Sequence, residues 1–200
     1  MKKAILYIHG KGGSHLEAEQ YKKNCSGFDV IGIDYEVSFP WIVQNTIKSV
    51  YDEVQKEYDQ IFIIANSIGA YFTMHTLQDC KIEKALFISP ILDMERLILD
   101  MLSWANVSEK DLFERGEIPT DFGETLSWDY LCFVRDNPIK WNVPTEILYA
   151  GKDNLTSRQT VDMFIKSHNA SLTVLENGEH WFHTDEQLSF LNKWMATVIG

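Results

Sequence analysis

The sequence predicts an α/β fold that is doubly wound around a mostly parallel sheet of about six strands. Short apolar runs recur along the chain, helical patterns separate most of them, and the runs are continuously apolar instead of alternating with polar residues. The runs lie at 4–8, 30–33, 61–65, 85–88, 146–149 and 172–175. Continuous hydrophobicity is typical of strands in a parallel sheet that is covered by helices on both faces.

Helical patterns occupy the segments between these strands. A first helix is expected to begin near Pro40, because proline suits the first turn of a helix. The last helix is expected to begin near Thr184, which has Gln187 three positions later in the spacing of a capping box. The apolar helical faces comprise Val43, Ile47, Val50, Tyr51, Val54 and Tyr58, then Val161, Phe164, Ile165 and His168, then Leu188, Leu191, Met195 and Val198. Alternation of strands with helices predicts one α/β domain over residues 1–200.

One segment interrupts the alternation. Residues 91–141 separate the fourth and fifth strands by about 50 residues, whereas a simple crossover needs roughly a dozen. Its periodic apolar residues predict two or three helices, which we interpret as a small helical cap inserted in the domain. Six tryptophans are numerous for this length. We expect core packing to explain most of them, and those near the cap to be candidates for an acyl pocket.

Composition and charge restrict the class of partner. The chain has 200 residues, of which 45% are hydrophobic and 24% charged, as in ordinary soluble domains. Eighteen basic and 29 acidic residues give a net charge of −11, which disfavours binding to nucleic acid and to anionic membranes. The apolar start at 4–8 is too short for a signal peptide, so we expect a cytoplasmic protein. The sequence leaves its oligomeric state open.

A candidate nucleophile follows the third strand directly. Residues 65–69 read Ala-Asn-Ser-Ile-Gly and precede a helical segment, so Ser67 is expected in a strained turn at the carboxyl edge of the sheet. The small residues Ala65 and Gly69 would let strand and helix approach each other. The pattern is G-x-S-x-G with alanine in place of the first glycine. By itself such a pattern is common by chance.

A glycine-rich loop follows the first strand. Residues 9–13 read His-Gly-Lys-Gly-Gly, a composition that lets backbone N–H groups approach a ligand closely. We predict that the N–H groups of Lys11 and Ile68 form an oxyanion hole, with His9 in a structural role. A phosphate-binding loop is the alternative. It is disfavoured because neither G-x-G-x-x-G nor the Walker pattern is present.

Two later loops supply an acid and a base for Ser67. Asp153 follows the fifth strand and His180 follows the sixth, and sites form at the carboxyl ends of strands in open α/β sheets. Asp93, after the fourth strand, is an alternative acid, and His183 is an alternative base that more simply belongs to the start of the last helix. The other histidines are expected to be structural, namely His15, His75 and His168.

With the order Ser67, Asp153, His180, the sequence resembles the α/β-hydrolase superfamily over nearly its whole length. The resemblance implies that Ser67 is the nucleophile, Asp153 the acid and His180 the base, with the loop at 9–11 as the oxyanion loop. Two departures are the missing first glycine of the serine motif and a chain that starts at the equivalent of the family's third strand. Within the family it is most similar to small bacterial serine esterases and carboxylesterase-like hydrolases.

The expected function is a serine hydrolase that cleaves a small carboxylic ester, or a related acyl compound, through an acyl-enzyme. No cofactor or metal is expected, and the expected partner is a small-molecule acyl substrate. Three alternatives remain open at this stage. They are a ligand-binding protein on a hydrolase scaffold, an acyltransferase or perhydrolase that uses another acceptor, and a peptidase.

Overall fold

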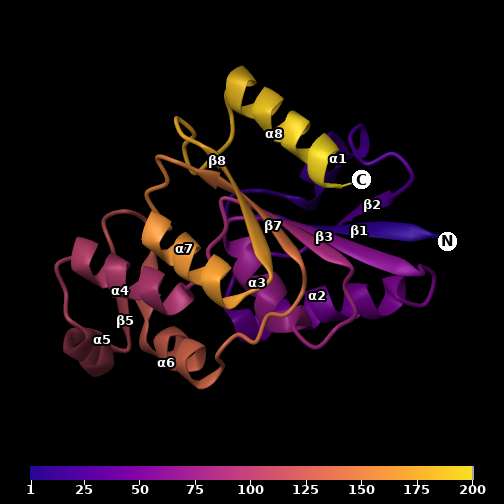
Figure 1. Cartoon of the computed structure of the whole chain (residues 1–200). Coiled ribbons are helices and arrows are strands. Elements are labelled where there is room, and N and C mark those ends of the chain that lie inside the picture. Colours follow the sequence, from indigo (N-terminus) through magenta and orange to yellow (C-terminus); the bar gives the residue numbers. More distant parts are fainter. Residues whose placement is uncertain (200) are drawn as a thin grey trace. The chain divides into compact units, whose positions relative to one another are not determined.

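The six apolar runs form the six strands of one sheet in the computed structural model, which describes residues 1–199 (Figure 1). The spatial order is β2-β1-β3-β4-β7-β8, and every neighbouring pair is parallel. The strands are β1 (Lys3–Ile8), β2 (Asp29–Gly32), β3 (Gln60–Asn66), β4 (Lys84–Ile88), β7 (Thr145–Ala150) and β8 (Ala170–Leu175). The predicted fold class is therefore confirmed.

The register of the sheet brings the ends of its strands to one edge. Ile8 at the end of β1 pairs with Ala65, and Asn66 at the end of β3 pairs with Ile88. On the other side, Ala150 at the end of β7 pairs with Leu175 at the end of β8. Because these strands are parallel and end almost level, the loops that follow them lie together along the carboxyl edge.

Helices cover both faces of this sheet, which explains why its strands are continuously apolar. In Figure 1, α1 and α8 lie on one side of the strands, while α2 and α3 lie on the other. On the first side the core comprises residues such as Tyr7, Ile64, Leu148, Trp194 and Met195. The helices are η1 (His15–Ala18), α1 (Glu19–Lys22), α2 (Pro40–Val54), α3 (Ile68–Leu77), α7 (Arg158–Ser167) and α8 (Asp185–Val198). Within residues 1–199, no helix is both long and apolar enough to cross a bilayer.

The predicted helix starts are confirmed, but two helices end earlier than predicted. Pro40 occupies the first turn of α2, and Thr184 and Gln187 form the capping box of α8. Tyr58 lies beyond the end of α2, where a turn intervenes and its hydroxyl donates to Asp29. His168 lies beyond α7 in extended conformation, with its N–H still donating to the Phe164 carbonyl. A helical period alone does not show where the backbone leaves the helix.

The described chain separates into two compact units, residues 93–139 and the remainder. The smaller unit lies within the segment 91–141 that the sequence singled out. Its helices are α4 (Met94–Trp104), α5 (Glu109–Arg115) and α6 (Trp128–Asp136), and it also contains an antiparallel pair, β5 (Glu117–Pro119) and β6 (Thr125–Ser127). The pair was not predicted because strands of this length carry too little pattern. The role of this unit as a cap stays a prediction.

A single arginine joins the three helices of the smaller unit. Arg135 on α6 donates from Nε to Glu95 on α4 at 2.7 Å, and from its two terminal nitrogens to Glu109 on α5 at 2.7 and 2.9 Å. The planar guanidinium suits this geometry because it presents several donors in a fixed fork. The unit is therefore held together by polar contacts as well as by its apolar residues.

The expectation that core packing explains most of the tryptophans is wrong. Of the six, only Trp141 and Trp194 are buried. Trp181 is 73% exposed and stacks on His183, while Trp104 is 48% exposed and packs edge-on against Phe122. These surface rings are partnered by other rings, an arrangement that their hydrophobicity did not reveal.

Candidate active site

Ser67 occupies the turn between β3 and α3. Its φ of 52° and ψ of −122° lie in a region that residues with a side chain rarely adopt. Three backbone hydrogen bonds maintain this conformation. The Ser67 N–H donates to the Ile88 carbonyl at 3.0 Å, and the Ser67 carbonyl accepts from the N–H groups of Ala70 and Ile91 at 3.1 and 3.0 Å. Strain held in this way is typical of functional sites, and here it fixes the serine above the sheet edge.

The small residues around Ser67 are required by close backbone contacts. A Cβ at position 69 would lie 2.6 Å from the Ile8 carbonyl oxygen and 2.7 Å from that of His9, so α3 begins directly against the end of β1. A Cβ at Gly10 would lie 3.0 Å from the Cβ of Ser67. Ala65, which replaces the usual glycine, is fully buried in β3. The glycine-rich loop after β1 thus packs onto the candidate nucleophile.

The structure brings Ser67, His180 and Asp153 together. His180 Nε2 lies 2.8 Å from Ser67 Oγ, and His180 Nδ1 lies 2.8 Å from Asp153 Oδ2. A carboxylate accepts but does not donate, so Nδ1 carries the proton and Nε2 is left to accept from the serine hydroxyl. This is the hydrogen-bonding order of a nucleophile, a base and the acid that orients the base.

Asp153 and His180 have surroundings different from those of the alternative candidates Asp93 and His183. The Asp153 side chain is fully buried, and its Oδ1 accepts from the N–H groups of Leu155 and Thr156 at 2.8 and 3.0 Å. By contrast, Asp93 caps α4 by accepting from the Arg96 N–H at 2.9 Å. His183 is exposed and its Nδ1 lies 2.7 Å from the Trp181 carbonyl oxygen. Of the two histidines after β8, His180 is therefore the one placed against Ser67.

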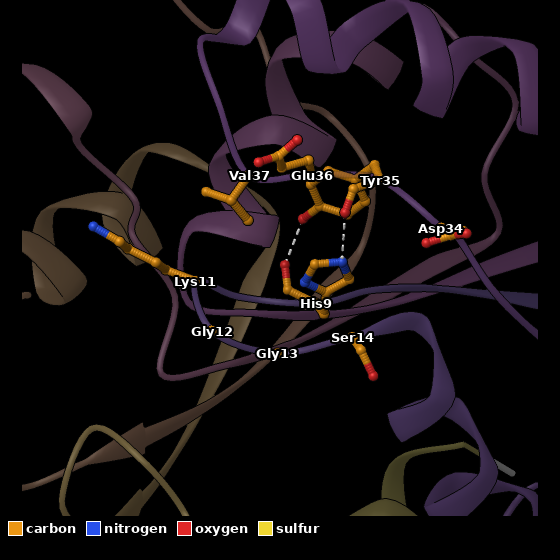
Figure 2. Close-up of a pocket in the computed structure, with 9 residues that line it drawn as sticks. All are labelled: His9, Lys11, Gly12, Gly13, Ser14, Asp34, Tyr35, Glu36 and Val37. Atoms are coloured by element: carbon orange, nitrogen blue, oxygen red, sulfur yellow. Dashed lines mark hydrogen bonds between the residues drawn. The ribbon is translucent and has the colours of Figure 1, made fainter.

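The glycine-rich loop is fastened to the rest of the sheet edge by His9. The ring of His9 stacks on Tyr35 with centroids 4.3 Å apart, and its two nitrogens lie 2.8 Å from the Gly10 carbonyl oxygen and 3.1 Å from that of Tyr35. Figure 2 shows these two residues packed together, with the side chain of Lys11 extending away from them. All three residues line a pocket of about 440 Å³. The ring thus has the structural role predicted for it.

Of the two predicted oxyanion donors, Ile68 adjoins Ser67 in the chain, and Lys11 belongs to the loop that packs on Ser67. Ile68 follows Ser67 as the first residue of α3, and Lys11 follows Gly10, whose backbone lies against Ser67. The amide of Ile68 is at a helix N-terminus, where the backbone N–H groups have no partner within the helix. The oxyanion role of Lys11 and Ile68 stays a prediction.

A partly buried polar network beside the serine was not predicted from the sequence. Asn66 Nδ2 donates to the Tyr7 hydroxyl at 2.9 Å, and that hydroxyl donates to Glu17 Oε2 at 2.5 Å. The Glu17 carboxylate lies under the glycine-rich loop, where a Cβ at Gly13 would meet it at 3.0 Å. Burial raises the pKa of Tyr7 well above its usual range, so the hydroxyl stays a donor. The sequence signal that could have revealed this network is one polar side chain near the end of each of two apolar strands, Tyr7 in β1 and Asn66 in β3.

No metal site accompanies this arrangement in the part of the chain that the structure describes. Nowhere in residues 1–199 do three or more His, Cys, Asp or Glu side chains gather in a way that would hold an ion.

A parallel sheet with a strained serine after a central strand, followed in the chain by an acid and a histidine at the same edge, defines the α/β-hydrolase fold. The chain belongs to the uncharacterised protein family UPF0227, whose sequence model matches residues 4–191. Comparison with curated proteins finds no match.

Solved structures share this fold at low sequence identity. Est1E from Butyrivibrio proteoclasticus is 16% identical, with a TM-score of 0.76 over 98% of this chain and 86% of Est1E. The mouse α/β hydrolase domain-containing protein 10 is 14% identical, with a TM-score of 0.80 over 98% of this chain and 89% of that protein. A monoacylglycerol lipase from Paleococcus ferrophilus is 14% identical, with a TM-score of 0.62 over 97% and 94% of the two chains.

Proposed function

We propose that this protein is a serine hydrolase that cleaves a small carboxylic ester through an acyl-enzyme. The observation that carries the proposal is the continuous hydrogen-bonded series from Ser67 through His180 to Asp153, with both contacts at 2.8 Å. A serine hydroxyl is a weak nucleophile unless a neighbouring base accepts its proton. Here a base with a fixed tautomer is already within hydrogen-bonding distance, and an acid whose charge is buried stands behind it.

In the proposed reaction, Ser67 Oγ attacks the carbonyl carbon of the ester while His180 Nε2 accepts the serine proton. The tetrahedral intermediate collapses as His180 donates that proton to the leaving alcohol, which leaves an acyl group on Ser67. His180 then accepts a proton from water as the water oxygen attacks the acyl carbon. It donates this proton to Ser67 Oγ when the second tetrahedral intermediate collapses, which releases the acid and restores the serine. Asp153 holds the ring of His180 in orientation and stabilises the imidazolium in both steps.

The developing negative oxygen needs donors that are in place before the reaction. We propose the N–H groups of Ile68 and Lys11 for this role, because one follows Ser67 at the start of α3 and the other belongs to the loop that packs on Ser67. Preorganised backbone donors of this kind supply a large part of the catalysis in acyl transfer. Since they are backbone groups, the side chain of residue 11 is not needed for this step.

The proposal that the substrate is an ester is supported by the solved structures that share the fold. Among the structures that share the fold, Est1E is described with bound ferulic acid, and another is a monoacylglycerol lipase. Both descriptions concern carboxylic acids or their esters. We therefore propose an ester of a small carboxylic acid as the substrate class, with no cofactor taking part in the reaction.

Hydrolysis of a series of p-nitrophenyl esters from acetate to long acyl chains tests this function. Wild-type protein is expected to turn over at least one member of the series, and Ser67→Ala is expected to lose on the order of a million-fold in turnover. Ser171→Ala is the matched control because Ser171 is an exposed serine on β8. It should retain wild-type turnover. Wild-type protein that hydrolyses no ester, or a Ser67→Ala variant that is as active as wild type, would contradict the proposal.

A further inference from the structure

We propose that Thr156 is a positioning residue that sets the place of the acid relative to the nucleophile. It would do so by binding the loop of Asp153 to the segment 88–91, which also holds Ser67. This inference rests on the proposed function, since it assigns a role to Thr156 in the same site. Thr156 does not touch the serine or the histidine, so its effect would be transmitted through Asp153.

Thr156 is buried, and its hydroxyl, its N–H and its carbonyl each make a hydrogen bond. Its side chain is 5% exposed, and its hydroxyl donates to the Pro90 carbonyl at 2.9 Å. Its N–H donates to Asp153 Oδ1 at 3.0 Å, and its carbonyl accepts from the Tyr149 hydroxyl at 2.9 Å. A residue held from three directions has little freedom to move, and the carboxylate that it contacts shares this restriction.

The segment 88–91 joins the other side of the site. The Ile88 carbonyl accepts from the Ser67 N–H, and the Ile91 N–H donates to the Ser67 carbonyl, both at 3.0 Å. Pro90, between them, receives the Thr156 hydroxyl. Two loops that follow different strands are therefore connected through a single short segment.

The conformation of this segment depends on Ser89. Ser89 has a φ of 43°, in the left-handed region, and is 1% exposed. Its N–H donates to the Leu148 carbonyl at 2.9 Å, which attaches the segment to β7, the strand that precedes the loop of Asp153. A strained and buried turn persists only where its surroundings determine it. Here the hydrogen bonds of Ile88 and Ile91 to Ser67, and of Ser89 to Leu148, hold it.

The consequence concerns the distance between Asp153 and Ser67. His180 bridges the two residues with contacts of 2.8 Å at each end, so a shift of the acid loop lengthens one contact or rotates the ring. Small misplacements of reacting groups are costly to catalysis. The loop after β7 that contains Asp153 has one side chain that hydrogen-bonds to the segment 88–91 within the described residues. This side chain is Thr156, through its hydroxyl.

The test compares Thr156→Val with Thr156→Ser and with a matched control, Thr145→Val. Valine keeps the shape of threonine but removes the bond to Pro90, whereas serine keeps the hydroxyl. Thr145 is a buried threonine at the start of β7, the end of the strand that lies opposite to the Asp153 loop. Its hydroxyl donates to the Val143 carbonyl and accepts from Trp141 Nε1, both at 2.8 Å. Thr145→Val therefore removes two buried hydrogen bonds away from the site, which makes it a stringent control.

The first readout is the ¹⁵N–¹H resonance of the His180 Nδ1 proton, identified by its loss in His180→Ala. The Nδ1 proton is protected from exchange with water by its contact with Asp153, so the resonance can be observed without turnover. It is expected in wild type, in Thr156→Ser and in Thr145→Val, and it should be lost or exchange-broadened in Thr156→Val. An unchanged resonance in Thr156→Val, or its loss in Thr145→Val as well, would overturn the inference.

The second readout is the rate of ester turnover. Thr156→Val is expected to lower kcat by about tenfold or more with KM nearly unchanged, because a mispositioned base slows chemistry without altering substrate binding. Thr156→Ser should restore kcat to within about threefold of wild type, and Thr145→Val should leave it unchanged. A lost resonance in a protein that hydrolyses no ester would support the positioning role while refuting the proposed function. Unchanged kcat in Thr156→Val would count against the inference.

Discussion

At the scale of single residues, the candidate site depends on atoms that have no room to move. Gly69 illustrates this, because α3 can start at the sheet edge only where the residue after Ile68 lacks a Cβ. The same close approach brings Gly10 against Ser67. The sequence indicated these positions as small residues around a serine, and the structure shows which backbone atoms require them to be small.

We expect Gly69→Ala to lower the free energy of unfolding by about 1 to 3 kcal/mol, the usual cost of forcing a methyl group into a closely packed site. The new methyl group would meet two carbonyl oxygens of the β1 end at 2.6 and 2.7 Å. Gly178→Ala is the control, because its methyl group would come no closer than 3.1 Å to any neighbour and would meet mainly the Leu175 side chain. Urea denaturation of both variants measures the difference. Equal stability for the two would show that the contact between α3 and β1 is not tight.

At the scale of elements, the network of Tyr7, Asn66 and Glu17 connects β1 and β3 to the loop that follows β1. Tyr7→Phe removes the hydroxyl that accepts from Asn66 and donates to Glu17. We expect a loss of about 1 to 3 kcal/mol in the free energy of unfolding, because the partly buried side chains of Asn66 and Glu17 both lose a partner. The turnover of esters should also fall, since the network lies beside Ser67 and under the glycine-rich loop.

The control for this prediction is Tyr58→Phe. The Tyr58 hydroxyl also donates to a carboxylate, Asp29 at 2.9 Å, but this contact is at the surface. Surface contacts of this kind usually change stability by less than about 0.5 kcal/mol. Thermal or urea unfolding that ranks Tyr58→Phe as equally destabilising would argue that the partly buried network does not hold the elements together.

The strands were predictable from sequence, whereas several contacts between elements were not. The four inner strands β1, β3, β4 and β7 are largely buried, so their residues are mostly apolar without alternation and the pattern identifies them. The edge strands β2 and β8 are only partly buried but keep apolar runs. The proximity of Ser67, Asp153 and His180 was predictable because each of them follows a strand, and the ends of parallel strands meet. The partners Tyr7 and Asn66 lie 59 residues apart, and Thr156 and Pro90 lie 66 apart. No local pattern reports such pairs, since they are chosen by packing.

At the scale of the whole molecule, burial of several tyrosines makes stability sensitive to alkaline pH. Desolvation raises the pKa values of Tyr7, Tyr21, Tyr35 and Tyr71 above their ordinary value of 10.0, and it raises the pKa of Cys25 to about 11. Above pH 10 the unfolded chain loses these tyrosine protons while the folded chain keeps them. The unfolded state then binds fewer protons, so the free energy of unfolding must fall as pH rises.

The expected slope is up to about 1.4 kcal/mol per pH unit for each tyrosine that remains protonated in the folded state. Urea denaturation at several pH values between 8 and 11 measures it. Tyr21→Phe removes one of these groups and should make the decline shallower. A free energy of unfolding that is constant up to pH 11 would show that these hydroxyls ionise equally well in the folded and unfolded chains.

The central claim is that Ser67 is an activated nucleophile, and covalent labelling tests it most directly. A fluorophosphonate reacts with a serine whose proton is accepted by a neighbouring base, and mass spectrometry of the digested protein identifies the modified residue. We predict one label per chain, located at Ser67, and no label in Ser67→Ala or His180→Ala. An unlabelled wild-type protein, or a label at another serine that persists in Ser67→Ala, would contradict the account.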